Sequence, residues 1–496
     1  MKLKFILGVS SALCLCATIA QAQETNWEKR LQQMSENFAR QQREMQERFD
    51  KKTAAQDAEI ESLKKQLGGL PPAPLLGASS SAASASAGQG SFAPAQTALA
   101  PKPWTPSDPI RVGKGGTYMN ISFDALVAAG ASTANDIESL QLGGHDPKQR
   151  GFTIQNLETG FDGAVDPYFR GQANIVMQLN AAGETTVEAE EAYLETMSLP
   201  LNLQVKAGQF FTEFGRLNPQ HPHSWAFVDQ PLVNGRFLGE DGLRNPGVRL
   251  SWLAPTPFYS ELFFTVQNSQ GGTAHSFRDR HGGDPFFGRV NTERSVKKFS
   301  DMLYSARYAA SFEPTENQTL LGGLSAVFGP NSSGTNSDTA TQIYGADVYW
   351  KWKSPRAHGG FPFVTWQTEA MLRRYQAGAS TTVDLNNDTV LDPVPRETVT
   401  DWGAYSQLAW GFKPGWIAAL RGDFVTGDKA DYEKLYGADV SRATRWRVSP
   451  NLTWFPSEFS KIRLQYNYDH RDLIGVDHSI WLQFEFLLGA HAAHKF

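Results

Sequence analysis

The 496-residue sequence predicts an all-β fold, a 16-stranded antiparallel transmembrane β-barrel preceded by an α-helical coiled-coil segment. After Pro109, apolar and polar residues alternate with a period of two, as in strands with one apolar and one polar face. Beyond the N-terminus there is no apolar run of about 18 residues, which excludes a bundle of transmembrane helices. The mean hydropathy of −0.39 is compatible with a transmembrane barrel, because its strands are apolar on one face only.

The first 22 residues are expected to be a secretory signal peptide. Lys2 and Lys4 precede an apolar stretch at 5–19, and a small-residue cleavage site follows at 20–22. Both cysteines of the chain, Cys14 and Cys16, lie in this segment. The mature chain is therefore expected to be exported and to have no disulfide, thiolate metal site or cysteine nucleophile.

Residues 23–67 are expected to form a periplasmic coiled coil. Apolar residues recur there at steps of three and four, from Trp27 and Leu31 to Leu63 and Leu67. A lone amphipathic helix is the alternative. Residues 68–109 are rich in Pro, Ala, Ser and Gly and are expected to be a flexible linker. Residues 110–496 are assigned to the outer-membrane barrel.

The expected strands follow one another as sixteen alternating segments. They lie near residues 119–127, 157–165, 169–179, 187–199, 201–211, 248–252, 258–266, 304–312, 318–328, 344–352, 362–375, 402–412, 416–424, 446–454, 462–468 and 480–488.

The connections between these segments alternate strictly between short and long. A barrel with both termini in the periplasm has this arrangement, with short inner turns and long outer loops. Tryptophans beside short turns (Trp410, Trp416 and Trp454) and near outer strand ends (Trp402 and Trp446) are typical of the two aromatic girdles of such a barrel. A soluble periplasmic all-β protein is the alternative.

The polar faces of the expected strands carry arginines and carboxylates, as the wall of a water-filled channel needs. Arg421, Arg445, Arg447 and Arg463 lie on three successive expected strands. One interpretation of these four arginines is a strip that guides anions, since a guanidinium binds carboxylate or phosphate through a bidentate fork. The other interpretation is a set of Arg–Asp pairs that brace the wall. The expected selectivity residues on the strands are Arg373, Arg421, Asp423, Arg445, Arg447 and Arg463.

The third long connection, residues 212–244, is dense in charged, imidazole and aromatic side chains. In 16-stranded porins the third outer loop folds inward and narrows the pore, so this stretch is the expected constriction. His221 and His223 are weak candidates for a zinc or copper site, because an H-P-H pair is more often two polar loop residues. The expected selectivity residues here are Arg216, Asp229, Arg236, Glu240, Asp241 and Arg244.

The run at 207–210, Ala-Gly-Gln-Phe, followed by Phe214-Gly215, resembles the phosphate-selective porin O and P family. The resemblance implies a 16-stranded, trimeric outer-membrane barrel, and some relatives carry an N-terminal coiled coil. The third connection contains arginines but no lysine, so the solute is left open.

The expected function is that of a porin, a water-filled channel for small hydrophilic and anionic solutes in the outer membrane of a Gram-negative-type bacterium. The expected partners are outer-membrane lipids, two further copies in a homotrimer, and peptidoglycan in contact with the coiled coil at 23–67. No cofactor and no enzymatic activity are expected, and a net charge of −5 argues against nucleic acid. The alternative is an outer-membrane anchor whose coiled coil contacts the cell wall, with little channel activity.

Overall fold

The computed structural model describes residues 110–114, 117–164, 166–180, 182–279, 285–335, 338–384 and 389–489. The expected signal peptide, coiled coil and linker lie outside these described residues. Among the described helices, none has the length and apolar character needed to cross a membrane.

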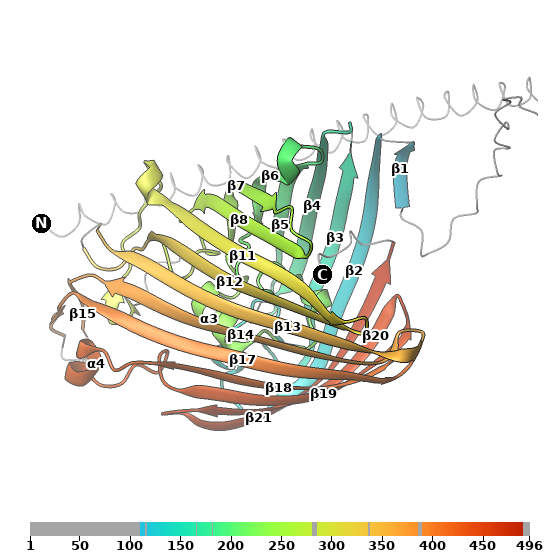
Figure 1. Cartoon of the computed structure of the whole chain (residues 1–496). Coiled ribbons are helices and arrows are strands. Elements are labelled where there is room, and N and C mark those ends of the chain that lie inside the picture. The colour runs from blue at the N-terminus through green and yellow to red at the C-terminus, as the bar shows by residue number, and fades with distance from the viewer. Residues whose placement is uncertain are drawn as a thin grey trace, which may run out of the picture. The chain divides into compact units, whose positions relative to one another are not determined.

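Sixteen strands form a closed antiparallel ring (Figure 1). Each strand pairs with the next one along the chain, and β21 pairs with β2 through Phe123 opposite Leu488, which closes the ring. The predicted 16-stranded barrel is therefore confirmed. The strands are β2 (Thr117–Ser132), β3 (Gly151–Ala164), β4 (Phe169–Leu179), β5 (Thr185–Thr196), β6 (Leu203–Phe211), β7 (Arg244–Leu253), β8 (Tyr259–Asn268), β11 (Met302–Thr315), β12 (Gln318–Pro330), β13 (Ala340–His358), β14 (Phe361–Ala377), β17 (Glu397–Lys413), β18 (Trp416–Gly427), β19 (Arg445–Ser457), β20 (Ser460–Arg471) and β21 (Gly475–Leu488).

A further strand, β1 (Ile110–Lys114), was not predicted. It forms a hairpin with the start of β2, with Ile110 opposite Ile121, just beyond the point where β21 ends. The remaining short elements lie in connections: α2 (Ile137–Leu140), α3 (Leu232–Leu238), α4 (Asp431–Tyr436), the 3₁₀ helices η1 (Pro200–Asn202), η2 (Pro222–Ser224) and η3 (Phe299–Asp301), and the strand pairs β9 (Pro285–Phe286) with β10 (Arg289–Val290) and β15 (Ser380–Val383) with β16 (Asp392–Val394).

Short turns and long loops alternate around most of the ring, but the β20–β21 connection at 472–474, which was expected to be in the longer class, has only three residues. The turns at 316–317, 359–360 and 414–415 join strands at one end of the barrel, and the loops at 269–301, 378–396 and 428–444 join them at the other. We call these the short-turn end and the long-loop end. All but one of the extra helices and short strand pairs are in the long loops, because the short turns leave no room for them.

Side chains alternate between the two faces of the wall. On β18, the outward Leu420 is 52% exposed and the inward Arg421 is 1% exposed. The outward face is apolar and carries aromatic pairs, such as Trp416 stacked on Trp454 at 5.7 Å. The inward face is polar and charged, as the alternation predicts.

Away from the short turns, two β-bulges interrupt this alternation in the described strands. On β3, Gln155 has no cross-strand partner, since Asn156 pairs with Leu126 and Ile154 with Val127. On β5, Glu190 is skipped in the same way between Ala189 and Glu191. A bulge turns two consecutive side chains toward the same face, so that Glu190 and Glu191 are both buried inside the barrel.

Candidate functional site

The barrel interior is occupied by loop three, which we define as residues 212–243 between β6 and β7. Its first segment crosses to β12–β14. The Gly215 amide donates to Ser325 Oγ (3.0 Å) and the Leu217 amide to Glu369 Oε1 (2.8 Å). Gly215 has a φ of +62°, and a Cβ there would lie 2.2 Å from a Glu369 oxygen. The Phe214-Gly215 motif therefore lets the loop backbone lie against the wall.

The second segment lies against β2, β3 and β5. Pro222 begins η2, and the rings of His221 and His223 on either side of it are stacked, with centroids 5.7 Å apart. Both rings are buried and face carboxylates of the wall. The sequence alternative of two ordinary polar loop histidines does not describe this arrangement, since the rings point into the protein.

The third segment lies against β18–β20, and Asp229 is its main anchor. The Asp229 carboxylate, 1% exposed, accepts hydrogen bonds from Arg421 (2.6 Å), Arg447 (2.9 Å), Gln465 (2.9 Å) and Asn467 (2.6 Å). Burial raises its pKa, but Arg421 and Arg447 outweigh burial and hold the pKa of Asp229 below its usual value.

The last segment contains α3, which lies within the ring of strands (Figure 1). Its buried apolar residues pack on the inner wall. Six neighbouring strands each place one apolar residue on the inward face at this level, and together with Phe214, Leu232, Val233, Phe237 and Leu238 of loop three they form one buried cluster. The wall residues are Leu303, Val327, Ile343, Met371, Tyr405 and Val425.

The four arginines of the expected anion strip are buried and engaged. Arg421, Arg445, Arg447 and Arg463 are 1–4% exposed. Arg421 pairs with Asp229 and Asp423, whereas Arg445 and Arg447 share Asp469. Arg463 donates to Thr453, to Gln483 and to the Trp225 carbonyl of loop three. In this structure these arginines brace the wall and hold loop three, as the second interpretation of the sequence expects.

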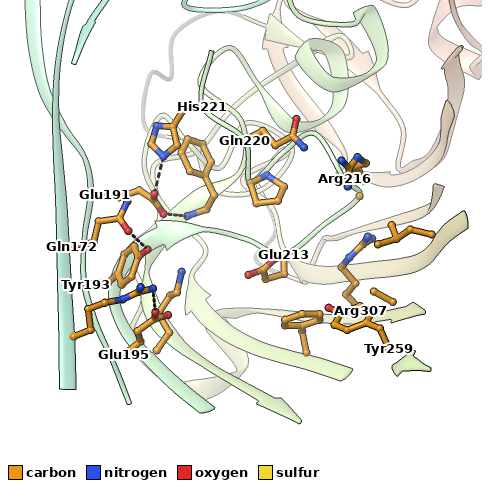
Figure 2. Close-up of a pocket in the computed structure, with 18 residues that line it drawn as sticks. Gln172, Glu191, Tyr193, Glu195, Glu213, Arg216, Gln220, His221, Tyr259 and Arg307 are labelled. Carbon is orange, nitrogen blue, oxygen red and sulfur yellow. Dashed lines mark hydrogen bonds and ion pairs between the residues drawn. The ribbon is translucent and has the colours of Figure 1, made fainter. Parts of the chain in front are cut away.

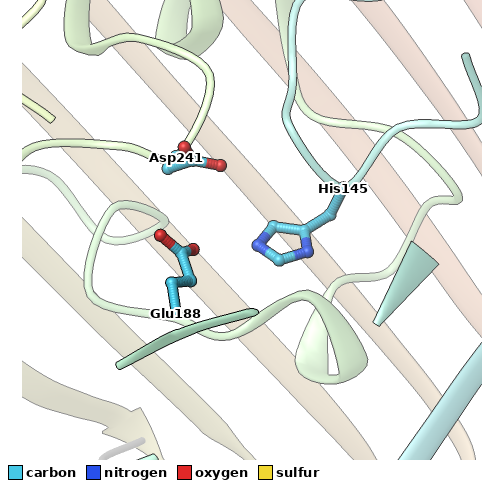
Figure 3. Close-up of side chains that lie close together, drawn as sticks. All are labelled: His145, Glu188 and Asp241. Carbon is cyan, nitrogen blue, oxygen red and sulfur yellow. The ribbon is translucent and has the colours of Figure 1, made fainter. Parts of the chain in front are cut away.

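Among the other expected selectivity residues, some form ion pairs and two face open space. Arg373 pairs with Asp401 (2.7 Å), Arg244 with Glu188 (2.7 Å), and the exposed Glu240 with Lys148. The carboxylate of Asp241 lies close to the imidazole ring of His145 and to the carboxylate of Glu188, as Figure 3 shows.

Arg216 and Arg236 are the expected residues that face open space. Arg216 stacks over Tyr349 at 4.0 Å and donates to Gln367 (3.3 Å). Among the described residues, Arg236 donates to the carbonyl oxygens of Arg442 (3.4 Å) and Ala443 (3.1 Å) and has no carboxylate in ion-pair contact. Burial and the charge of Arg445 lower the pKa of Arg236 to about 9.

Two hollows lie on either side of loop three. The one at the long-loop end has a volume of about 640 Å³ and is lined by Arg236 and by residues of three long loops. The one at the short-turn end, of about 160 Å³, is drawn in Figure 2, with His221, Glu191 and Glu195 on one side and Arg216 and Arg307 on the other. Loop three lines both hollows and therefore lies between them.

Several residues of this site were missed by sequence reasoning. The carboxylates around His221 come from Glu190 and Glu191, which the bulge on β5 turns inward together. Strict alternation would send one of them to the lipid face. The one available signal was the density of glutamates at positions 188, 190 and 191 in a weakly alternating segment.

A known bacterial protein is similar in sequence to most of this chain. No family model matches the chain. An uncharacterized protein of Aquifex aeolicus (strain VF5) is 33% identical over 376 residues, which cover 71% of this chain and 73% of that protein. The chain belongs to the same family as this Aquifex protein. The resemblance to the phosphate-selective porins stays a prediction.

Solved structures with a similar course of the chain are outer-membrane proteins. The outer-membrane channel DcaP of Acinetobacter baumannii has a TM-score of 0.49 and 14% identity, with 76% of this chain and 99% of that chain covered. An anion-selective porin from Comamonas acidovorans has a TM-score of 0.47 and 8% identity, with 75% and 100% covered. Salmonella typhi OmpF in complex with daunomycin has a TM-score of 0.45 and 11% identity, with 76% and 100% covered.

Proposed function

We propose that the chain forms a channel for small hydrophilic solutes through the outer membrane of a Gram-negative-type bacterium, with a preference for anions. The observation that carries the proposal is a closed ring of strands, apolar outside and charged inside, with loop three between two hollows. A closed barrel satisfies every backbone hydrogen bond within its wall, which a lipid environment requires. A charged inner wall keeps such a channel filled with water.

The outward face supports a lipid environment. Large apolar side chains of this face are exposed, including Leu408 (48%), Trp410 (52%) and Phe486 (54%). Aromatic residues gather at both ends of the strands: Trp416 and Trp454 beside the short turns, and Trp402, tilted against Phe424, toward the long loops. This is the distribution that a barrel needs at the two lipid–water interfaces.

The preference for anions rests on cations that are not neutralised by carboxylates. Among the described residues, no carboxylate forms an ion pair with Arg216 or with Lys351, which lies on the inward face of β13 two residues beyond Tyr349. Arg216 and Lys353 both repel the charge of Lys351. Three positive charges thus gather near the short-turn end, and Arg236 adds a fourth at the long-loop end.

The test is single-channel conductance in a planar lipid bilayer, with reversal potentials in a KCl gradient. The wild-type chain should give discrete steps and a chloride preference. Replacing Arg216 and Lys351 together by glutamine should lower the chloride-to-potassium permeability ratio. One charge about 8 Å from an ion in water contributes about 0.5 kcal/mol, or roughly a twofold change in local anion concentration.

Arg396→Gln is the matched control. Arg396 is 45% exposed in a long loop and pairs with Asp338, so its loss should leave the permeability ratio nearly unchanged. If the wild-type channel prefers cations, the proposal of a channel is kept and the proposed anion preference is contradicted. A folded chain without conductance would contradict the channel and favour the anchor.

A homotrimer is also part of the proposal. Two shallow apolar hollows on the outward face over β7, β8, β11, β12 and β13, lined by Val248, Phe264 and Leu324 among others, offer packing surface for a second copy. Native mass spectrometry of the detergent-solubilised chain should give three copies, and a monomer would contradict this part. Contact between residues 23–67 and peptidoglycan stays a prediction.

A further inference from the structure

A buried group of histidine and carboxylate side chains lies where loop three meets β2, β3 and β5. We call it the histidine–carboxylate cluster and define it as Asp124, Glu158, Glu190, His221 and His223. These side chains are 0–9% exposed. They come from three wall strands and from η2, so the cluster joins loop three to the barrel wall.

The ligand-type atoms of Glu158, Glu190 and His221 converge, all within 4.8 Å of one another, and His223 and Asp124 extend the cluster beside Glu158. His221 Nδ1 lies 2.7 Å from Glu190 Oε2 and 3.5 Å from Glu158 Oε2. The same Glu158 oxygen lies 3.3 Å from His223 Nδ1, which is 3.5 Å from Asp124 Oδ2. Ligands at about 2.0–2.1 Å from a tetrahedral zinc ion are about 3.3–3.4 Å from one another. Three of the four distances are close to that spacing.

Glu191 orients the His221 ring. Its Oε2 lies 3.0 Å from His221 Nε2, on the side of the ring away from Glu158 and Glu190. If Nε2 carries the proton for this hydrogen bond, Nδ1 presents a lone pair to the cluster. A carboxylate that fixes the tautomer of a histidine in this way is the usual outer partner of a metal-ligating histidine.

The buried negative charge of the cluster favours the binding of a cation. It contains three carboxylates, and among the described residues no lysine or arginine forms an ion pair with any of them. Asp124 is 0% exposed, and neither of its carboxylate oxygens accepts a hydrogen bond within the described part of the chain. Among the described residues only histidines, including His145 beside Glu190, lie at ion-pair distance from these carboxylates. Burying carboxylates is costly, and a divalent ion among them would remove most of that cost.

A second group of histidine and carboxylate side chains already has a cation beside it. His145, Glu188 and Asp241 lie close together (Figure 3), but Arg244 already pairs with Glu188 at 2.7 Å. His145 Nδ1 is bonded to the Gln155 carbonyl oxygen (2.9 Å). An arginine beside the two carboxylates supplies the positive charge that a metal ion would otherwise provide, so we read this group as an ion-pair network.

We propose that the histidine–carboxylate cluster binds one divalent transition-metal ion of the zinc class, which fastens loop three to the barrel wall. The imidazole of His221 with the carboxylates of Glu158 and Glu190 forms a donor set suited to zinc and its neighbours rather than to calcium or magnesium, which take oxygen ligands. His221 and Glu191 also line the hollow at the short-turn end, which gives an ion a route to the cluster (Figure 2).

The experiment is a calorimetric titration of the full-length chain in detergent with Zn²⁺ alone. The protein is first treated with EDTA, and its folding is checked by the heat-dependent shift of the barrel band on a gel. We expect one Zn²⁺ per chain and a rise in the thermal unfolding temperature of the saturated protein. His221→Gln and Glu158→Gln should each weaken Zn²⁺ binding by at least about 100-fold, since even loss of an outer partner costs 10- to 100-fold. His275→Gln, a half-exposed histidine beside Asp279, is the matched control and should bind as wild type does.

The wild-type titration decides the proposal even if a variant does not fold. Absence of stoichiometric Zn²⁺ binding by the folded wild-type chain would overturn it and leave protons on the histidines as the cations of the cluster. Binding that persists undiminished in both folded cluster variants would also overturn it. The heat-dependent shift of the barrel band on a gel reports whether each variant is folded.

Discussion

At the scale of single residues, Asp229 determines what the arginines of β18 and β19 can do. Its carboxylate accepts hydrogen bonds from Arg421 and Arg447 and lies on a loop 192 residues away from Arg421 in sequence. The two arginines are neutralised by this contact and by Asp423 and Asp469. They act as anchors for loop three and add little positive charge to the lumen.

Asp229→Asn should therefore destabilise the protein strongly. The amide keeps the shape of the side chain but leaves Arg421 and Arg447 buried with less compensation, and breaking a buried ion pair typically costs about 3–5 kcal/mol. Tryptophan fluorescence during denaturant unfolding in detergent should show the loss. The mutant channel should also be noisier, because loop three loses its attachment to β18–β20.

Asp338→Asn is the control for this change. Asp338 pairs with Arg396 at the surface, where the two side chains are 61% and 45% exposed, and water and salt screen the pair. Its loss should leave the unfolding curve close to that of the wild-type chain. Equal effects of the two substitutions would mean that Asp229 is not an anchor.

At the scale of elements, helix α3 explains a feature that alternation alone could not. Six successive wall strands place an apolar side chain such as Leu303, Ile343 or Val425 inside a barrel whose inner wall is largely polar. These residues are buried because α3 covers them with Leu232, Val233 and Phe237. Loop three is therefore held by apolar packing at one end and by ion pairs at the other.

Phe237→Ala tests the apolar attachment. Phe237 is fully buried and also lies under the Arg373 guanidinium, 4.8 Å from its carbon. Removing a buried phenyl ring costs about 3–5 kcal/mol in a well-packed core, and here the loss should loosen α3 while the strands stay paired. We expect a larger fluctuation of the open-channel current at unchanged circular dichroism.

Phe299→Ala provides the comparison, because Phe299 is 83% exposed in a long loop and should tolerate removal of its ring. If Phe237→Ala lowers the strand content instead, α3 contributes to folding of the wall itself and not only to the position of loop three.

At the scale of the whole molecule, the strands of the barrel wall could be predicted from the sequence, but the contacts between loop three and the wall could not. Alternation repeats along most of the wall, so segments such as 416–424 and 480–488 could be placed with the correct inward and outward faces, whereas the bulges on β3 and β5 break the pattern. The ion pairs of Asp229 and the two bulges depend on how distant segments meet, and no local pattern encodes that. The basic strip on β18–β20 was therefore located correctly, but its burial under loop three could not be foreseen.

The anion strip expected from the sequence would become functional if loop three were removed. Asn218 and residues 242–243 lie side by side, since Asn218 Oδ1 accepts from the Leu243 amide at 2.8 Å. Residues 219–241 can thus be replaced by a short glycine linker without stretching the chain. The ring of strands should survive, because its hydrogen-bonded pairings do not include loop three.

In this deletion variant, Arg421 and Arg447 lose Asp229 and face water. We expect a conductance several-fold above that of the wild-type chain and a stronger chloride preference, measured by reversal potential at low salt, where charges are least screened. Adding Arg447→Gln to the deletion should reduce the chloride preference while the conductance stays high, which separates charge from pore width. A wide channel that prefers potassium would show that Asp423 and Asp469 still control the wall after the loop has gone.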